Sequence, residues 1–237
     1  WDWVWIDGQH GQPGYQDTLA LVRACNLVDR PAFVRVPWLE AGHIGLALDM
    51  DPAGIIVPCI DTPEEAQRAV HAAKFPPLGK RSYGGRRPID RAGRLYSNKA
   101  NQDVMLVLQV ETPEGLDNAE AIAAIPGVDA LFLGPDDISL RRGIAMDQPR
   151  TKAILGKDME TVMTACRKHG KVGVMVGTSP ETLDWSAKLG YTMIVAGGDV
   201  PFLATGSKQA AAAARDALKA IRPGSAAAVT SSASSPY

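Results

Sequence analysis

The stretch VMLVLQVETPEGLDNAEAIAAIPGVDALFLGPDD at residues 104–137 decides the fold. Two short apolar runs, at 104–110 and 130–134, flank a segment with helical periodicity. Neither run alternates apolar and polar residues, which is typical of strands buried on both faces of a parallel sheet. TPEG at 112–115 combines a capping threonine, a proline suited to the first helical position and a glutamate suited to the first turn. The stretch therefore predicts a strand, a helix and a second, parallel strand.

The same unit recurs along the whole chain. Helical periodicity appears again at 17–28 and 158–169, and the helix-start signal appears again as TPEE at 62–65 and SPET at 179–182. Five more apolar runs are predicted strands: WVWI at 3–6, FVRVP at 33–37, GIIVP at 54–58, VGVMVG at 172–177 and TMIVAGG at 192–198.

Seven repeats of strand and helix predict an α/β fold with a parallel sheet. An open, doubly wound sheet is disfavoured because neither G-x-G-x-x-G after an early strand nor a P-loop motif occurs. We predict a (β/α)8 TIM barrel over residues 1–221, with its first strand expected before Trp1, since such barrels typically have ~250 residues. Residues 222–237 are of low complexity and are expected to form a tail.

Composition excludes several classes of protein. The chain has 237 residues, and 25 Lys and Arg against 26 Asp and Glu give a net charge of -1, which disfavours nucleic acid or a membrane surface as a partner. No apolar run approaches the ~18–20 residues that cross a bilayer. Cys25, Cys59 and Cys166 are odd in number and far apart, which favours a reducing, cytoplasmic location over a disulfide framework or a cysteine zinc site.

Polar side chains stand where the predicted strands end. Asp7 follows the first strand, Arg35 lies inside the second, and Gln109 is near the end of the strand at 104–110. In a barrel, the reacting groups collect at the carboxyl ends of the strands. Glu111 and Asp137 follow two neighbouring strands, and two carboxylates with few other charges suit a hard divalent ion that acts as a Lewis acid. The alternative is that Glu111 faces the next helix and Asp137 caps a turn near Ser139.

Arg35 and His10 are the next candidates. A guanidinium in a buried strand must meet a carboxylate or a substrate anion, so Arg35 either binds substrate or forms a structural salt bridge with Asp7 or Glu111. His10 is either a proton carrier near neutral pH or an ordinary loop residue. None of the ten lysines lies within or just after a predicted strand. A Schiff-base mechanism needs such a lysine, so a metal-dependent mechanism is favoured.

These residues stand in longer matching stretches. They are WDWVWIDGQHG at 1–11, FVRVPW at 33–38, LDMDPAGIIVPCIDTPEEAQRAVHAAKFPPLGKRS at 48–82, QVETPEGLDNAEAIAAIPGVDALFLGPDDIS at 109–139 and VAGGD at 195–199. In this order and spacing the chain resembles the metal-dependent, class II pyruvate aldolases of the HpcH/HpaI aldolase/citrate lyase family. The resemblance implies a (β/α)8 barrel in a hexamer, a trimer of dimers whose C-terminal helices are exchanged.

The resemblance also implies an activity and a role for each site residue. Members of the family cleave 4-hydroxy-2-oxoacids to pyruvate and an aldehyde, and they run the condensation in reverse. Glu111 and Asp137 would bind Mg2+, Mn2+ or Co2+, and Arg35 would hold the keto oxygen and the enolate. The remaining roles would be proton transfer by His10 with Asp49, orientation of the site by Asp7, and substrate binding by Gln109 and the turn of Gly134, Pro135 and Asp136, whose backbone amides would receive the pyruvate carboxylate.

Two departures from the family pattern leave alternatives open. Gln9 replaces the glutamate of the usual D-G-E-H motif, which changes hydrogen bonding near His10. The basic region at 76–101 differs from the usual pattern; it is either a solvated loop or subunit contact, or an anion-facing flap that favours an acidic or extended acceptor. Oxaloacetate decarboxylation through the same enolate, as in macrophomate synthase, is an alternative activity, and a catalytically silent barrel with a binding role is a third.

Overall fold

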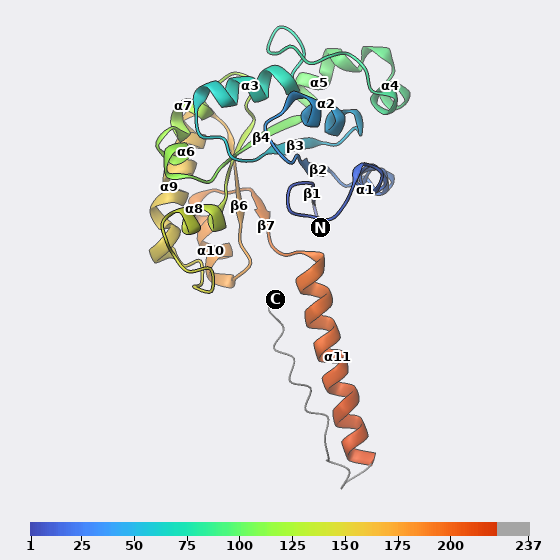
Figure 1. Cartoon of the computed structure of the whole chain (residues 1–237), viewed down its shortest axis with the longest axis vertical. Coiled ribbons are helices and arrows are strands. Elements are labelled where there is room, and N and C mark those ends of the chain that lie inside the picture. Colours follow the sequence, from blue (N-terminus) through green and yellow to red (C-terminus); the bar gives the residue numbers. More distant parts are fainter. Residues whose placement is uncertain (222–237) are drawn as a thin grey trace. The chain divides into compact units, whose positions relative to one another are not determined.

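A computed structural model gives the structure of residues 1–221, and the described chain divides into two units, Trp1–Ala196 and a second that begins at Gly197. In the first unit, seven parallel strands follow one another in sequence order and form a nearly closed barrel (Figure 1). Their bounds are β1 Val4–Asp7, β2 Ala32–Arg35, β3 Gly54–Val57, β4 Met105–Val110, β5 Ala130–Leu133, β6 Val172–Val176 and β7 Met193–Val195. All seven predicted strands are confirmed, as is the TIM-barrel class.

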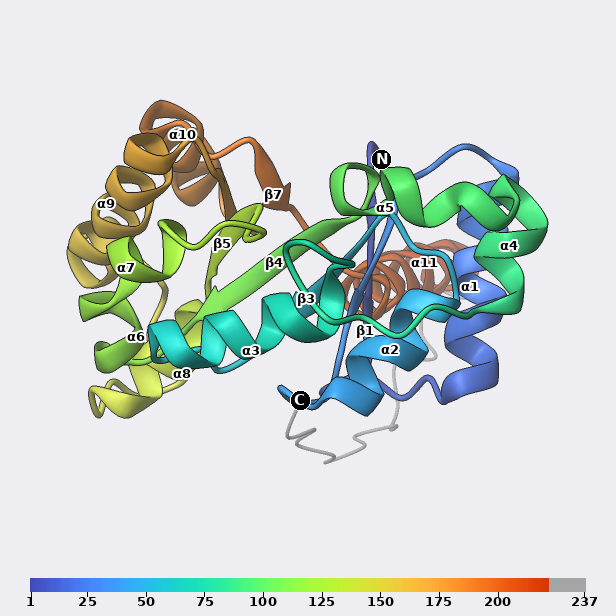
Figure 2. The same cartoon turned by 90° about the horizontal axis from the view of Figure 1, so that it is seen from above.

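Helices cover the outside of the strands (Figure 2). They are α1 Tyr15–Leu27, α2 Ala41–Asp49, α3 Pro63–Ala73, α6 Pro113–Asp117, α7 Ala119–Ala123, α8 Pro135–Arg141, α9 Lys152–His169 and α10 Pro180–Leu189. The three start signals form true caps, because the hydroxyls of Thr62, Thr112 and Ser179 accept the amide hydrogens of Glu65, Gly115 and Thr182. Each cap satisfies a backbone donor that the first helical turn leaves free.

The basic region at 76–101 is more ordered than its sequence suggests. It holds α4 Arg86–Ala92, the 3-10 turn η1 Arg94–Tyr96 and the start of α5 Ser97–Asp103. These helices are too short to show an apolar periodicity that a sequence reader could recognise. An aromatic cluster stabilises them, since the Tyr83 and Tyr96 rings lie 5.5 Å apart and the Tyr96 hydroxyl donates to the carbonyl of Gly84.

The barrel has an inner and an outer apolar layer. Val107 and Phe132 belong to the inner cluster, whereas Leu106, Leu108 and Leu131 pack outward against the helices. Alternate residues of each strand are therefore buried on opposite faces, which explains the unbroken apolar runs. The inner cluster fills the barrel below the carboxyl ends of the strands and forms the floor of the candidate site.

The second unit begins with α11 Asp199–Ile221, and the predicted tail at 222–237 lies outside the described residues. The proposed domain boundaries remain a prediction. In the described part of the chain, no helix is both long enough and apolar enough to cross a membrane.

Candidate active site

The structure gathers four of the predicted site residues at the carboxyl end of the barrel. Asp7 and Arg35 are the last residues of β1 and β2 and stand opposite each other in the strand register. Gln109 is on β4, and Glu111 directly follows that strand. The side chains of these residues connect in one continuous chain of hydrogen bonds, which runs from Asp7 through Arg35 and Gln109 to Glu111.

Asp7 and Arg35 form a two-pronged salt bridge. Arg35 Nε donates to Asp7 Oδ1 at 2.8 Å and Nη2 donates to Oδ2 at 2.6 Å. Burial alone would raise the pKa of Asp7, but the hydrogen bonds and charge of Arg35 outweigh burial and lower this pKa below its usual value. The structural salt bridge considered from the sequence is therefore present. It uses two of the five N–H donors of the guanidinium.

Arg35 is fixed from two further directions. Its Nη1 donates to Gln109 Oε1 at 3.4 Å, and its guanidinium carbon lies 4.6 Å from the centre of the Trp5 ring. A cation over an aromatic face is attracted by the ring quadrupole. Trp5 is an inward residue that sequence reasoning missed. The available signal was its position two residues before Asp7, which places both side chains on the same face of β1.

Glu111 is the most deeply buried carboxylate of the site, with 1% of its surface exposed. Its Oε1 accepts hydrogen bonds from the Cys59 amide at 2.9 Å and from the Cys59 thiol at 3.2 Å, and its Oε2 accepts from Gln109 Nε2 at 2.6 Å. Burial raises the pKa of Glu111, the Cys59 hydrogen bonds lower it, and the nearby charge of Asp137 raises it again. The positive charge of Arg35 also lowers this pKa, but the net direction is upward, so the charges and hydrogen bonds around Glu111 do not fully offset its burial.

This donor set fits a hard divalent cation. Asp137 lies close enough to Glu111 for their charges to repel, and a cation between two such carboxylates removes that repulsion. Two protein oxygens leave the remaining coordination positions for water and substrate. Residues 1–221 contain no group of three or more His, Cys, Asp and Glu side chains placed to hold a metal. The chain's own ligands for a cation would therefore be the two carboxylates of Glu111 and Asp137.

The turn after β5 approaches Glu111 very closely. A side chain at Gly134 would collide with the Glu111 carboxylate, so only glycine fits there. The amide of Gly134 is already used, because it donates to the carbonyl of Val110 at 3.1 Å. Pro135 begins α8, whose first-turn amides have no intrahelical acceptor. Asp136 points to solvent and pairs with Arg150 at 3.0 Å.

His10 and Asp49 are not brought together within the chain. His10 is exposed in the loop after β1, where its amide donates to Asp7 Oδ1 at 3.2 Å. Asp49 is the last residue of α2, a helix that runs back from the carboxyl end of β2 toward the start of β3. Asp49 therefore lies toward the opposite end of the barrel, where it forms an ion pair with Arg81 at 3.7 Å.

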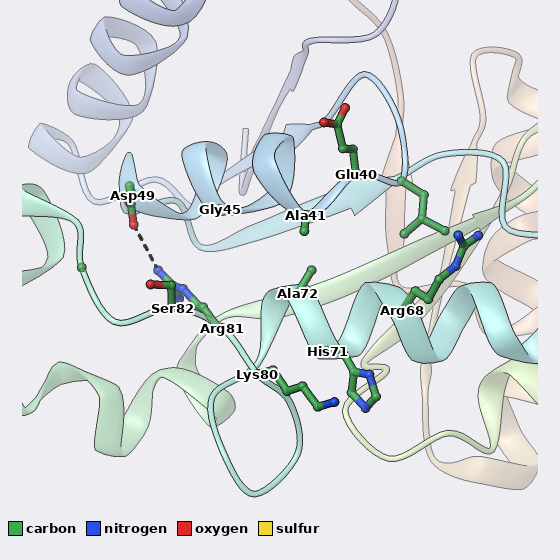
Figure 3. A pocket seen from close by; sticks show the side chains of 12 residues that line it. Glu40, Ala41, Gly45, Asp49, Arg68, His71, Ala72, Lys80, Arg81 and Ser82 are labelled. Carbon is green, nitrogen blue, oxygen red and sulfur yellow. Dashed lines mark ion pairs between the residues drawn. The ribbon is translucent and has the colours of Figure 1, made fainter.

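Asp49 lines a pocket of about 640 Å³ between α2 and α3 (Figure 3). The other charged or titratable side chains of its lining are Glu40, Arg68, His71, Lys80 and Arg81. Burial raises the pKa of Asp49, and the nearby Arg81 only partly offsets this rise. The predicted His10–Asp49 pair thus remains a prediction that a single chain does not satisfy.

The chain matches a known protein family over most of its length. The family model of HpcH/HpaI aldolase/citrate lyase matches residues 1–205. The chain belongs to this family. Hydroxypyruvate/pyruvate aldolase of Chromohalobacter salexigens is 32% identical over 209 residues, which are 85% of this chain and 80% of that protein. The 4-hydroxy-2-oxovalerate aldolase of Novosphingobium aromaticivorans is 39% identical over 146 residues, which are 61% of this chain and 56% of that protein.

Solved structures share the fold of this chain. An HpcH/HpaI aldolase/citrate lyase family protein from Burkholderia cenocepacia J2315 aligns with a TM-score of 0.81 and 31% identity, covering 91% of this chain and 86% of that one. Macrophomate synthase aligns with a TM-score of 0.80 and 26% identity, covering 93% of this chain and 78% of that one. The family that the sequence resembles is thereby confirmed.

Proposed function

We propose that this family member is a divalent-metal-dependent aldolase that cleaves a 4-hydroxy-2-oxoacid to pyruvate and an aldehyde, and catalyses the reverse addition. The observation that carries the proposal is the buried hydrogen-bonded chain from Asp7 to Glu111 at the carboxyl end of the barrel. Relatives that are 32% and 39% identical are named as aldolases of pyruvate, hydroxypyruvate or 4-hydroxy-2-oxovalerate, which supports this activity.

Cleavage breaks the bond between C3 and C4 of the substrate. The C4 hydroxyl loses its proton, C4 becomes the aldehyde carbonyl carbon, and the bonding electron pair moves to the pyruvate half as an enolate. Protonation of C3 then gives pyruvate. Glu111 and Asp137 would hold Mg2+, Mn2+ or Co2+, and such an ion supplies Lewis acidity toward the 2-oxoacid.

The chain's own residues then have distinct tasks. A guanidinium has five N–H donors, and Arg35 uses two on Asp7 and one on Gln109. Two donors remain for the substrate keto oxygen as it gains negative charge, and they are held in place before the reaction begins. Gln109 orients Arg35 through its carbonyl and Glu111 through its amide. His10 would carry protons at the open end of the site.

We further propose a cytoplasmic hexamer, a trimer of dimers. Within one chain, Asp49 lies away from His10, so the expected pair would have to form with Asp49 of a second copy. Mass measurement in solution tests the assembly. Mixing inactive His10→Ala and Asp49→Asn proteins tests the pairing, because mixed assemblies regain activity only if the two residues act from different subunits.

The main test measures turnover of 4-hydroxy-2-oxoacids with and without metal. A chelator should abolish cleavage, and Mg2+, Mn2+ or Co2+ should restore it. Borohydride added with pyruvate should trap no covalent adduct, since no lysine of residues 1–221 lies within or directly after any of the strands β1 to β7. A trapped adduct would replace the metal mechanism with a Schiff base.

A second candidate is oxaloacetate decarboxylation, which gives the same enolate by loss of CO2. Structural similarity to macrophomate synthase supports this alternative. Comparing kcat/KM for oxaloacetate and for a series of 4-hydroxy-2-oxoacids separates the two activities. If both substrate classes stay unchanged with metal present, the barrel has only a binding role.

A further inference from the structure

Cys59 has an unusual backbone conformation beside the candidate metal site. It follows β3 and has a φ of 55°, in the left-handed region that residues other than glycine, asparagine and aspartate rarely adopt. The next residue ties this turn to the neighbouring strand, because the Ile60 amide donates to the carbonyl of Gln109 at 3.0 Å. Such a strained residue persists only where the surrounding contacts hold it, and strain of this kind clusters at functional sites.

The turn directs two donors of Cys59 to one oxygen of Glu111. The amide reaches Oε1 at 2.9 Å and the thiol reaches the same Oε1 at 3.2 Å. An ionised carboxylate oxygen can only accept a hydrogen bond, so in this contact the thiol is the donor. Cys166 differs, since its thiol donates to a backbone carbonyl, that of Val172, at 3.5 Å.

The two oxygens of Glu111 are consequently used to different extents. A carboxylate offers about four acceptor positions, two on each oxygen. Oε1 receives two donors from Cys59, whereas Oε2 receives one, from Gln109 Nε2 at 2.6 Å. Oε1 is therefore saturated and Oε2 keeps one free position. The contacts also prevent the carboxylate from rotating, because each oxygen has its own partner.

We propose that Cys59 is a positioning residue for Glu111: it occupies Oε1 and presents Oε2 to the divalent cation. This inference rests on the proposed metal-dependent function. On this proposal, the left-handed turn and the thiol of Cys59 both strengthen metal binding by Glu111, a role that the other cysteines of the barrel do not share.

Calorimetric titration of the full chain with Mn2+ tests this role without any measurement of turnover. Cys59→Ala keeps the amide bond but loses the thiol bond, so Mn2+ should bind on the order of fivefold more weakly, the size expected for one hydrogen bond. Cys59→Ser restores a donor and should bind within about twofold of wild type. Cys25→Ala is the matched control, since Cys25 lies on α1, and it should bind Mn2+ like wild type.

Cys59→Gly separates positioning from stability. Glycine adopts a positive φ without a steric penalty, so this variant should melt at or above the temperature of Cys59→Ala. Without the thiol it should still bind Mn2+ no more tightly than Cys59→Ala. A purely structural role predicts instead that affinity follows the melting temperature across the series.

The result that would overturn the positioning role is wild-type Mn2+ affinity in Cys59→Ala, or equal loss in Cys59→Ser and Cys59→Ala. Failure of the proposed function has a different signature, in which wild-type protein itself binds no Mn2+ and Glu111→Gln changes nothing. If Cys59→Ala does not fold, the comparison of wild type, Cys59→Ser and Cys59→Gly decides the question in the same way.

Discussion

The two ends of the barrel each hold a buried cluster of charged side chains, and the clusters differ in how completely their charges are paired. At the amino end, Lys74 has 2% of its surface exposed, and its ammonium group donates to the carbonyls of Asn101 and Val104 and to Asp129 Oδ2, at 3.0, 2.7 and 2.7 Å. An ammonium has three donors, so every one is used. At the carboxyl end, Glu111 is equally buried, but its charge has no direct cationic partner in the described chain.

This difference indicates that the Lys74 cluster stabilises the fold, whereas the cluster around Glu111 binds a ligand. Asp129 Oδ2 also accepts the amide of Leu106 at the start of β4, so the Lys74 cluster ties α3 and β4 together. A fully paired cluster has no capacity left for a ligand. The site cluster keeps two N–H donors on Arg35 and one acceptor position on Glu111, and unfinished hydrogen bonding of buried groups is costly unless a ligand completes it.

The largest expected effect comes from removing a carboxylate charge at the carboxyl end of the barrel, where the charges are incompletely paired. Glu111→Gln and Asp137→Asn should reduce metal binding and turnover to background, because each removes one of two anionic ligands. The metal-free proteins should melt at the wild-type temperature or above, because repulsion between the two carboxylates disappears. Thermal melting with and without Mn2+ measures both effects. Collapse of either metal-free variant would show that the carboxylates support the fold instead.

Removing the charge of Lys74 at the amino end of the barrel should have the opposite effect: stability should fall while kcat is retained. Lys74→Met should lower the free energy of unfolding by about 3–5 kcal/mol, since it leaves Asp129 and two carbonyls without their partner. The kcat of the remaining folded enzyme should stay near wild type. Denaturant unfolding measures the first effect and active-site titration the second. Lys188→Met, which breaks an exposed pair with Asp184, is the matched control and should change neither quantity.

Arg35 both forms a structural salt bridge with Asp7 and keeps donors for the substrate, so its substitution tests both roles at once. Arg35→Lys retains a charge near Asp7 but loses the planar fork, so kcat and kcat/KM should fall together by on the order of 10²–10³. Proton exchange at the methyl group of pyruvate and oxaloacetate decarboxylation should fall by similar factors, because all three share the enolate. Wild-type exchange with a melting temperature several degrees lower would assign Arg35 to support alone.

Sequence reasoning succeeded where the signal is local. Seven strands and three helix caps were predictable because apolar runs and residues such as Thr62 and Thr112 act within a few positions. Asp7, Arg35 and Glu111 could be found because strand ends converge in a parallel barrel. The contacts between the site residues could not be predicted. Cys59 contacts Glu111 and Trp5 contacts Arg35, and each pair joins two strands whose spacing along the sequence follows no fixed rule.

The same limit explains the remaining surprises. Lys74 directly follows α3 in an ordinary helical pattern, and only contacts with residues distant in the sequence hold its ammonium group in the interior. The short helices α4 and α5 depend on an aromatic cluster rather than on their own periodicity. The expected pairing of His10 with Asp49 came from family resemblance, and the path of α2 within one chain keeps these residues apart.

The smallest expected effect is the acid sensitivity of the carboxyl end. Arg35 lowers the pKa of Asp7 below its ordinary value of 3.8, so the ionised carboxylate stabilises the folded state at all pH values well above 3.8. This contribution is lost as the pH falls through the lower pKa of the folded protein, because both states are then protonated. Asp7→Asn should therefore be less stable than wild type at pH 7, since Arg35 loses its carboxylate, and this difference in the free energy of unfolding should narrow as the pH falls below 3.8. Denaturant unfolding across this range, with metal absent, measures the slope. A difference that stays constant as the pH falls well below 3.8 would mean that the Asp7–Arg35 pair positions the site residues but adds no charge-dependent stability.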